Sequence, residues 1–296
     1  MVMLTGYAMF WSCWIETRFP NIEASTRKVL EKLGIPYRDM EGTSCCPEPF
    51  YTGLLDRELW LTMAARNLSI AEGMGLPVLT MCNGCYETLF EANEHLKENP
   101  EAKERVNKEL SKIGRRFQGT IEVKHLIEAL YEHGLDRIRQ AVVKPLTGVK
   151  IAVHPGCHLY RSKKPEDWYV KAQMFKELVA VTGAELVDYK LERLCCGFPQ
   201  RSFDEELSLK ETLNLKLSSI VEAGADVVAV ACPTCYLQFE VGQADLKSKL
   251  GAEYNLPVIY IAELIALAFG YKPGEIGLDI HRIPLTKILE KVGVTG

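Results

Sequence analysis

The chain has 296 residues, of which 47% are hydrophobic and 25% are charged, as in an ordinary soluble globular protein. Its formal net charge of -4 argues against nucleic acid or an anionic membrane surface as a partner. The longest apolar run, residues 259–269, is interrupted by Glu263 and is too short to span a bilayer. The first residues lack a basic segment and a signal-peptide cleavage site, so a cytoplasmic location is predicted.

Short apolar segments alternate with helical patterns through the first half of the chain. Strands are predicted at residues 2–10 and 77–81, with a short extended piece from residue 35. Helices are predicted at residues 22–33, with Asn21 as the N-cap, and at 54–73, 87–98, 97–118 and 123–133. The lysine- and glutamate-rich stretch 97–118 is interpreted as a solvated face rather than a docking surface.

The second half repeats this alternation. Strands are predicted at residues 149–153, 185–188, 226–231 and 257–260, and helices at 166–182, 204–222, 236–249, 261–269 and near 284. Pro145 and Gly148 mark a boundary between two domains, residues 1–147 and 148–296. The pattern predicts an α/β protein of two duplicated units with parallel sheets, in which sites form beyond the carboxyl ends of the strands.

All ten cysteines fall into two sets of five with the same order: a single cysteine, a vicinal pair and a C-x-x-C motif. The first set is Cys13, Cys45, Cys46, Cys82 and Cys85, and the second is Cys157, Cys195, Cys196, Cys232 and Cys235. The pair and the C-x-x-C motif are separated by 35 residues in both sets. The sequence therefore contains an internal duplication with a cysteine cluster in each copy.

Thiolates at this density in a reducing compartment favour a soft metal or a metal cluster. Structural zinc requires only four ligands, and a redox dithiol would explain the C-x-x-C motif of each set but not its other three cysteines. A vicinal disulfide would leave the duplication unexplained. An iron–sulfur cluster accounts best for the pattern, although an ordinary [4Fe-4S] cube also needs four thiolates. The fifth cysteine is then either spare or a ligand of a cluster of unusual shape.

The motifs also resemble a known family. Cys157, Cys195-Cys196-Gly197 and Cys232-Pro-Thr-Cys235 match the cysteine-rich CCG domain, while the first copy has Pro47 in place of the glycine. Two tandem copies resemble the cysteine-rich, B-type subunit of CoB–CoM heterodisulfide reductase, and the resemblance covers nearly the whole chain.

The resemblance implies that each five-cysteine set holds a non-cubane [4Fe-4S] cluster. It further implies that the heterodisulfide CoM-S-S-CoB binds between the clusters and is reduced to two thiols, a reaction of methanogenesis. The sequence has no flavin, nicotinamide or ferredoxin-type motif of its own. In the family, electrons arrive through a small ferredoxin-like subunit from a flavin-bearing subunit. The alternative is a non-catalytic electron-relay subunit of another CCG-domain oxidoreductase complex.

Few residues outside the cysteines are candidates for the site. His154 at a strand end could donate a proton to a leaving thiolate or a hydrogen bond to a cluster, or be a loop histidine bound by backbone. Arg18 and Arg161 follow the first cysteine of each set and could bind the anionic groups of the substrate, or be solvated surface charges. Trp11, Trp14 and Phe198 flank cysteines and could exclude water from a cluster or pack in the core.

Overall fold

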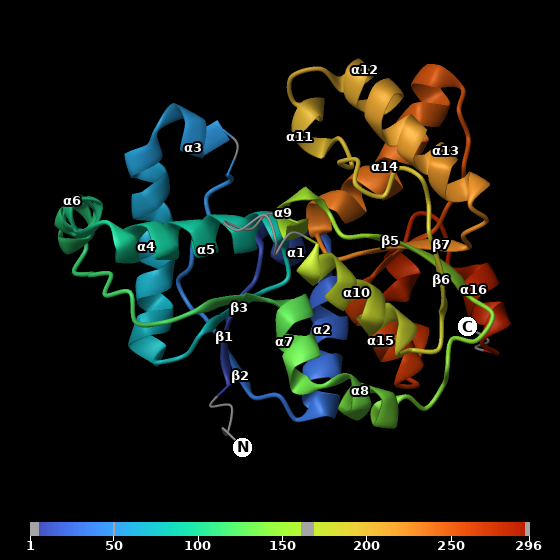
Figure 1. The fold of residues 1–296 in the computed structure, drawn as a ribbon, viewed down its shortest axis with the longest axis horizontal. Coiled ribbons are helices and arrows are strands. Elements are labelled where there is room, and N and C mark those ends of the chain that lie inside the picture. The colour runs from blue at the N-terminus through green and yellow to red at the C-terminus, as the bar shows by residue number, and fades with distance from the viewer. Residues whose placement is uncertain (1–5, 50, 161–168, 294–296) are drawn as a thin grey trace.

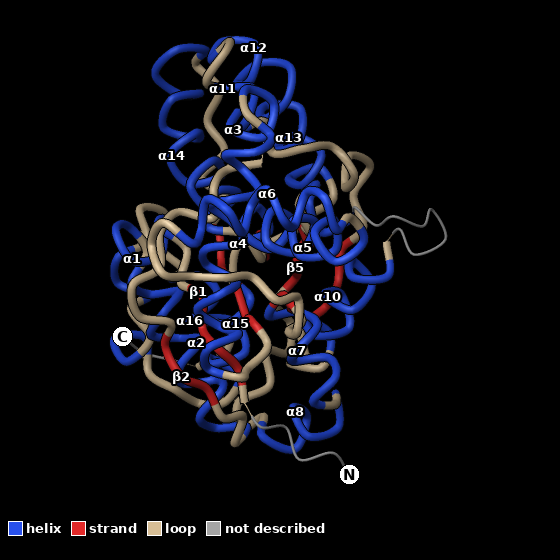
Figure 2. Tube along the Cα trace, turned by 90° about the vertical axis from the view of Figure 1, so that its left-hand side faces the viewer, coloured by secondary structure: helices blue, strands red, loops and turns tan. Residues whose placement is uncertain are grey.

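Two four-stranded parallel sheets, each flanked by helices, form the framework of the protein, as the sequence predicts. The computed structural model describes residues 6–49, 51–160 and 169–293. Figure 2 shows helices packed around the strands, and the strands inside each sheet are accordingly mostly buried and apolar. Among the helices of these residues, none combines the length and the apolar character that a membrane span requires.

The first sheet has the strand order β2-β1-β3-β4, and all its neighbours are parallel. Its strands are β1 (Tyr7–Phe10), β2 (Tyr37–Asp39), β3 (Val78–Thr80) and β4 (Val123–His125). Its helices are α1 (Cys13–Arg18), α2 (Pro20–Leu33), α3 (Tyr51–Leu55), α4 (Arg57–Met74), α5 (Asn83–Glu98), α6 (Pro100–Ser111), α7 (Leu126–His133) and α8 (Leu135–Ala141).

The second sheet repeats the arrangement with the order β6-β5-β7-β8. Its strands are β5 (Lys150–His154), β6 (Glu185–Val187), β7 (Val227–Val230) and β8 (Val258–Tyr260). Its α-helices are α9 (Cys157–Tyr160), α10 (Val170–Ala180), α11 (Phe198–Arg201), α12 (Glu205–Leu207), α13 (Leu215–Glu222), α14 (Pro233–Leu250), α15 (Ile261–Ala268) and α16 (Thr286–Lys291). A π-helical stretch, Ser208–Asn214, joins α12 to α13, and 3-10 turns lie at Pro273–Glu275 and Leu278–Ile280.

The register of the two sheets identifies equivalent residues. Phe10 lies opposite Thr80 in the first sheet, and His154 lies opposite Val230 in the second. Thr80 and Val230 differ by 150 positions, as do the cysteines of the pairs and of the C-x-x-C motifs. Phe10 and His154 therefore occupy the same place in the two copies. The domain boundary after residue 147 stays a prediction.

One strand differs from the sequence prediction. Residues 123–133 read as a single helix, but Val123–His125 form β4 and pair with β3. The helix starts only at Leu126, because the ring of His125 accepts a hydrogen bond from the Ile127 amide. The Glu128 carboxylate accepts one from the His125 amide, which completes a capping box. Local capping thus divides one helical pattern into a strand and a helix.

Two predicted helices are also interrupted by caps. Asp56 accepts a hydrogen bond from the Leu59 amide and starts α4, so α3 is a separate turn. Asn99 caps Ala102 in the same way at the start of α6, and the helical structure ends at Ser111 rather than continuing to residue 118. Both breaks follow from an acceptor side chain placed before a helix.

Helices of the two halves pack against each other across their interface. Helix α2 of the first half contacts α15 of the second, and α10 of the second half contacts α7 of the first. Figure 1 shows these four helices together between the two sheets. Asn21, predicted to be an N-cap, lies instead inside α2, and its amide donates to Glu263 Oε1 on α15 at 2.6 Å. Its equivalent on α10, Lys171, lies 3.7 Å from Glu128 on α7.

A buried polar network joins the C-terminal segment to this interface. His281 lies between two carboxylates, with Nδ1 3.1 Å from Glu240 Oε1 and Nε2 3.0 Å from Glu263 Oε1. The hydroxyl of Tyr236 lies 2.9 Å from the same imidazole. Burial lowers the pKa of His281, but the charge of Glu263 and hydrogen bonds from the ring to both carboxylates outweigh it and raise the pKa to about 10. The imidazolium therefore compensates the buried carboxylates.

Candidate functional site

The local fold places every cysteine beyond the carboxyl ends of the strands. The single cysteines Cys13 and Cys157 begin α1 and α9, and Cys82 and Cys232 are the residues that precede α5 and α14. The vicinal pairs lie in the loops that follow β2 and β6. Carboxyl ends of parallel strands share one edge of a sheet, and helix N-termini favour thiolates. These two effects explain why the sulfurs gather there.

Five sulfurs form one uninterrupted run of contacts in each half. The single cysteine contacts the first cysteine of the pair, and the two cysteines of the pair contact each other. The second cysteine of the pair contacts the last cysteine of the C-x-x-C motif, which in turn contacts the first cysteine of that motif. The runs are Cys13–Cys45–Cys46–Cys85–Cys82 and Cys157–Cys195–Cys196–Cys235–Cys232. Each duplicated unit therefore brings all five of its thiols to one place.

The two runs meet at a buried contact between the halves. Cys82 Sγ of the first set lies 3.9 Å from Cys232 Sγ of the second. Six of the ten cysteines are buried, whereas Cys13 and Cys45 are exposed and Cys157 and Cys195 are half-buried. The first set thus has an edge that faces solvent, and the second is more enclosed.

Hydrogen bonds between the sulfurs lower the pKa of three cysteines, namely the first member of each pair and Cys232. The bond that Cys45 accepts from Cys13, with a second from Cys46, lowers the pKa of Cys45 to about 3. Equivalent bonds from Cys157 and Cys196 lower the pKa of Cys195 to about 2. The pKa values of the donor thiols are raised in turn. A group of soft thiolate and thiol donors, enclosed and in mutual contact, fits a thiophilic metal group.

The loops that carry the pairs differ in one respect. Gly197 has φ +92°, and its amide donates to Cys195 Sγ at 3.4 Å. A Cβ at this position would lie 3.1 Å from the side chain of Thr212. The first copy has Pro47 here, which has no amide hydrogen and cannot make this bond to Cys45. The two copies therefore hold similar sulfur sets with different support.

A cavity of about 110 Å³ lies between the halves beside the second set. Four sulfurs of that set line it, together with residues of both halves: Trp14, Glu48, Pro49, Tyr51, Asn83, Gly84, His158, Phe198, Pro199 and Thr234. The rings of Trp14 and Phe198 meet edge to face at 6.1 Å across the interface. These two residues, predicted to flank the cysteines, therefore form part of an apolar wall.

The first half also supports the loop before Cys157. The amide of Asn83 donates to the carbonyl of Pro155 at 2.7 Å. Gly156 follows with φ +82°, and a Cβ there would lie 2.5 Å from the same amide nitrogen, so only glycine fits. The position of the second sulfur set thus depends on a side chain of the first half of the chain.

His154, the predicted candidate, lies at the end of β5 and is 2% exposed. A ring nitrogen and the sulfurs of Cys196 and Cys235 lie within 4.8 Å of one another. Neither ring nitrogen has a hydrogen-bond partner among the described residues. Burial lowers the pKa of His154 well below its usual value, so the imidazole is neutral and has one N–H to offer toward the sulfurs.

A second histidine of the site was missed from the sequence. His158 follows Cys157 on α9, lines the cavity and contacts the buried carboxylate of Glu87 of α5 through Nδ1. A carboxylate on one ring nitrogen fixes the orientation of the other. The sequence signal was weak, because Glu87 lies in the other half of the chain and no spacing connects the two residues.

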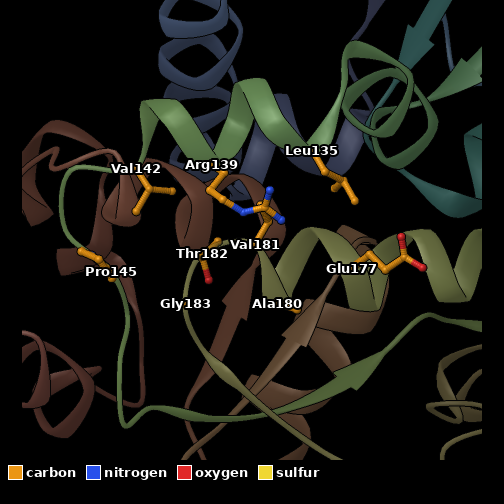
Figure 3. Close-up of a pocket in the computed structure, with 9 residues that line it drawn as sticks. All are labelled: Leu135, Arg139, Val142, Pro145, Glu177, Ala180, Val181, Thr182 and Gly183. Atoms are coloured by element: carbon orange, nitrogen blue, oxygen red, sulfur yellow. The ribbon is translucent and has the colours of Figure 1, made fainter.

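Of the two predicted basic residues, only Arg18 can be placed relative to the cavity wall. Arg18 is exposed in the last turn of α1 and does not line the cavity beside the cysteines. Arg161 lies outside the described residues. A larger cavity of about 490 Å³, shown in Figure 3, lies between α8 and α10 and is lined by Arg139 and Glu177 among others, without a cysteine. Both roles for Arg18 and Arg161 stay predictions.

Each pair loop is held by a side chain from the following long helical segment. Lys216 of α13 is fully buried, and its ammonium donates to the carbonyls of Leu191, Glu192 and Leu194 at 2.8, 3.0 and 2.5 Å. Burial lowers the pKa of Lys216 to about 8, against the opposing effect of the nearby cysteine sulfurs. The loop that leads into Cys195 is therefore fixed by a buried cationic residue.

In the first half the corresponding clamp is a neutral amide. Asn67 of α4 accepts from the Ser44 amide at 3.0 Å and donates to the carbonyls of Ser44 and Cys45 at 3.2 and 3.1 Å. Its neighbour Arg66, which is equivalent to Lys216 by the offset of 150, is partly exposed and donates to the Gly42 carbonyl at 2.8 Å.

The fold and the site define a duplicated cysteine-rich protein suited to bind a metal group in each copy. The cysteine-rich domain family called CCG matches residues 7–90 and 151–240. The B-type subunit of a CoB-CoM heterodisulfide reductase from Methanosarcina acetivorans is 40% identical over 290 residues, 96% of this chain and 96% of that protein. The chain therefore belongs to the tandem CCG-domain family of heterodisulfide reductase B-type subunits.

Other relatives extend the family beyond this reductase. The 8-methylmenaquinol:fumarate reductase membrane anchor subunit of Wolinella succinogenes is 31% identical over 288 residues, 97% of this chain and 100% of that protein. A solved structure of a hypothetical protein from Helicobacter pylori matches 95% of this chain with a TM-score of 0.75 at 19% identity. This chain spans 52% of that longer protein, and the likeness shows the fold alone.

Proposed function

We propose that this chain is an iron–sulfur subunit of a reductase complex and binds two [4Fe-4S] clusters, one on each five-cysteine set. The observation that carries the proposal is the unbroken run of five sulfurs in each half. A tetrahedral zinc site would use four of them and leave a fifth thiol in each run. Five ligands in contact favour a non-cubane cluster in which all five cysteines participate. The relatives that are named as B-type subunits of heterodisulfide reductases support this proposal.

The reaction that we propose is reduction of the heterodisulfide CoM-S-S-CoB, as in methanogenesis. Two electrons and two protons convert the disulfide into the thiols of coenzyme M and coenzyme B. When bound, the clusters supply the two electrons, one from each centre. The contact between Cys82 and Cys232 supports a single reaction zone, because it brings the two sets together between the halves.

Residues of the cavity wall, together with His154 beside the second sulfur set, would assist this chemistry. Trp14 and Phe198 would exclude water from the sulfurs, and the neutral imidazole of His154 would donate its N–H toward Cys196 or Cys235. Glu87 would hold the ring of His158 in one orientation at the cavity wall. Arg18 and Arg161 are proposed to attract the anionic substrate from the outside.

The chain has to receive its electrons from other subunits. By analogy with the relatives that are named as subunits, we assign this role to a small ferredoxin-like subunit, which is supplied in turn by a flavin-bearing subunit in the cytoplasm. The exposed Cys13 and Cys45 give the first set the open edge that an electron donor needs. We therefore expect electrons to enter at the first set.

A second function has one observation in its favour. The relative from Wolinella succinogenes is named as a subunit of a menaquinol:fumarate reductase, so tandem CCG domains occur in complexes with a different substrate. In that case this chain would only relay electrons between partners. Both functions require iron–sulfur clusters, but only the first requires disulfide cleavage by the chain.

The test is to purify the chain without oxygen and measure iron, acid-labile sulfide and zinc. About eight irons and eight sulfides per chain are expected for two four-iron clusters. The loaded protein, with a chemically reduced viologen dye, should then convert the heterodisulfide to two thiols. Full loading without cleavage would favour the relay, and about two zincs without sulfide would refute both functions.

A further inference from the structure

The most unusual buried group of the second half is the ammonium of Lys216. An ammonium has three N–H donors, and here all three are used by backbone carbonyls of residues 191, 192 and 194. A fully buried lysine is rare because desolvation of its charge is costly. No carboxylate of the described residues lies within ion-pair distance of its Nζ, so hydrogen bonds stabilise the ammonium without neutralising its charge.

This cation acts on the second sulfur set. The loop that it holds leads directly into Cys195 and Cys196, with Leu194 O accepting one of its bonds. The sulfurs of Cys196, Cys235 and Cys195 are the groups that favour its charge most, ahead of Glu192. Glu192 is itself paired with Lys176 at 2.7 Å. The ammonium and the second set therefore interact through a buried, weakly polarisable region in which charges are poorly screened.

The first set has no equivalent charge in its loop clamp. Asn67, which is neutral and buried, makes the hydrogen bonds to the loop before Cys46. Arg66 occupies the position equivalent to Lys216, but it is partly exposed, so solvent screens its charge. Two sulfur sets with the same order and the same contacts therefore lie in different electrostatic surroundings.

We propose that Lys216 makes the two centres electrochemically unequal: its buried charge stabilises added negative charge on the second set, so the second centre is reduced at a higher potential than the first. This inference rests on the proposed function, since it requires a cluster on each set. In the step concerned, one electron passes from a low-potential one-electron donor to the second centre. No covalent bond forms or breaks, and the ammonium keeps its proton.

The consequence is a direction for electron transfer. An electron that enters at the open edge of the first set moves on to the more enclosed second set, beside the cavity that four of its sulfurs line. Lys216 is then a positioning and tuning residue, because it does not line that cavity and acts through the sulfur set.

The test uses the anaerobically purified full chain and two substitutions. Lys216→Met removes the charge and keeps a long unbranched side chain, whereas Lys216→Arg keeps the charge. Arg66→Met is the matched control in the first half. Iron and sulfide are counted for each protein, and the centres are then titrated with dithionite while their paramagnetic signals are recorded. Assignment of the two signals uses variants that lack Cys46 or Cys196.

In the wild type, the second centre should be reduced at the higher potential. In Lys216→Met, the midpoint potential of this centre alone should fall, because one poorly screened positive charge is lost. At the wild-type midpoint potential, the ratio of reduced to oxidised second centre should be at least about tenfold lower than in the wild type. Lys216→Arg should keep the wild-type order, and Arg66→Met should leave both midpoints in place.

Equal midpoints in the wild type, or a fully loaded Lys216→Met with wild-type midpoints, would overturn the inference. If the second set of Lys216→Met binds no iron, the result for Lys216→Arg is decisive. The wild-type order of the two midpoint potentials in Lys216→Arg would support the role of the charge, and a reversed order would contradict it. Absence of iron from the wild type itself would instead refute the proposed function, on which the inference depends.

Discussion

His281 offers a direct test of the electrostatics at the interface between the halves. We predict that His281→Gln destabilises the protein at low pH and has little effect near pH 10. The folded pKa is raised from 6.5 to about 10, so the stabilising charge is fully present below pH 6.5 and is lost as the pH rises through about 10. That shift corresponds to roughly 5 kcal/mol at most, since one pKa unit is worth about 1.4 kcal/mol.

The assay is thermal unfolding of the anaerobically purified wild type and variant at pH 6, 8 and 10, at one scan rate. For a chain of this size about 2 °C of Tm corresponds to 1 kcal/mol. The gap in Tm between the wild type and His281→Gln should therefore approach roughly 10 °C at pH 6. It should narrow steadily toward pH 10. His95→Gln on α5 serves as the matched control, because it makes the same substitution outside this buried network. A gap for His281→Gln that is constant or widens with pH would refute the reasoning.

The other predictions concern the sulfur sets and the interface. Cys196→Ala and its equivalent Cys46→Ala should each disturb only the cluster of their own set and abolish disulfide cleavage; an intact spectrum with full activity would make that sulfur spare. His154→Phe, which copies Phe10 of the first half, should keep both clusters but slow cleavage by about 10- to 100-fold in the dye assay, and an unchanged rate would assign the histidine to packing. Tyr260→Phe removes hydrogen bonds to the carbonyls of Met81 and Ala231 and should lower Tm by about 2–6 °C; an unaltered Tm would contradict a role for these bonds.

The sequence was sufficient for the architecture because its signals are local. Apolar strands that run straight into Cys82 or Cys232 predict both a parallel sheet and the position of the cysteines at its edge, and the structure has them there. Strand β4 was missed because Val123–His125 continues without a turn into α7, so only pairing with β3 distinguishes it from a helix. Asn21 was predicted as a cap for a related reason, since its partner Glu263 lies in the other half.

The sequence predicted only those features of the site that follow from the repeated spacing of the cysteines. The order of the cysteines predicts two sets of five, but not that Cys82 and Cys232 meet. The contact between His158 and Glu87 and the three hydrogen bonds of Lys216 depend on how distant segments pack. Periodicity reports which face of a helix is buried, and it contains no information about which buried polar groups become neighbours.

The packing of helices of one half against the other has a consequence for biosynthesis. The contact between Asn21 and Glu263 spans 242 positions of sequence, and the sulfur contact between Cys82 and Cys232 spans 150. A nascent chain that has only just produced its first half lacks the surfaces that α2 and Cys82 need. If the proposed clusters bind as inferred above, we expect them to be inserted after translation, once the cysteines of both halves have left the ribosome.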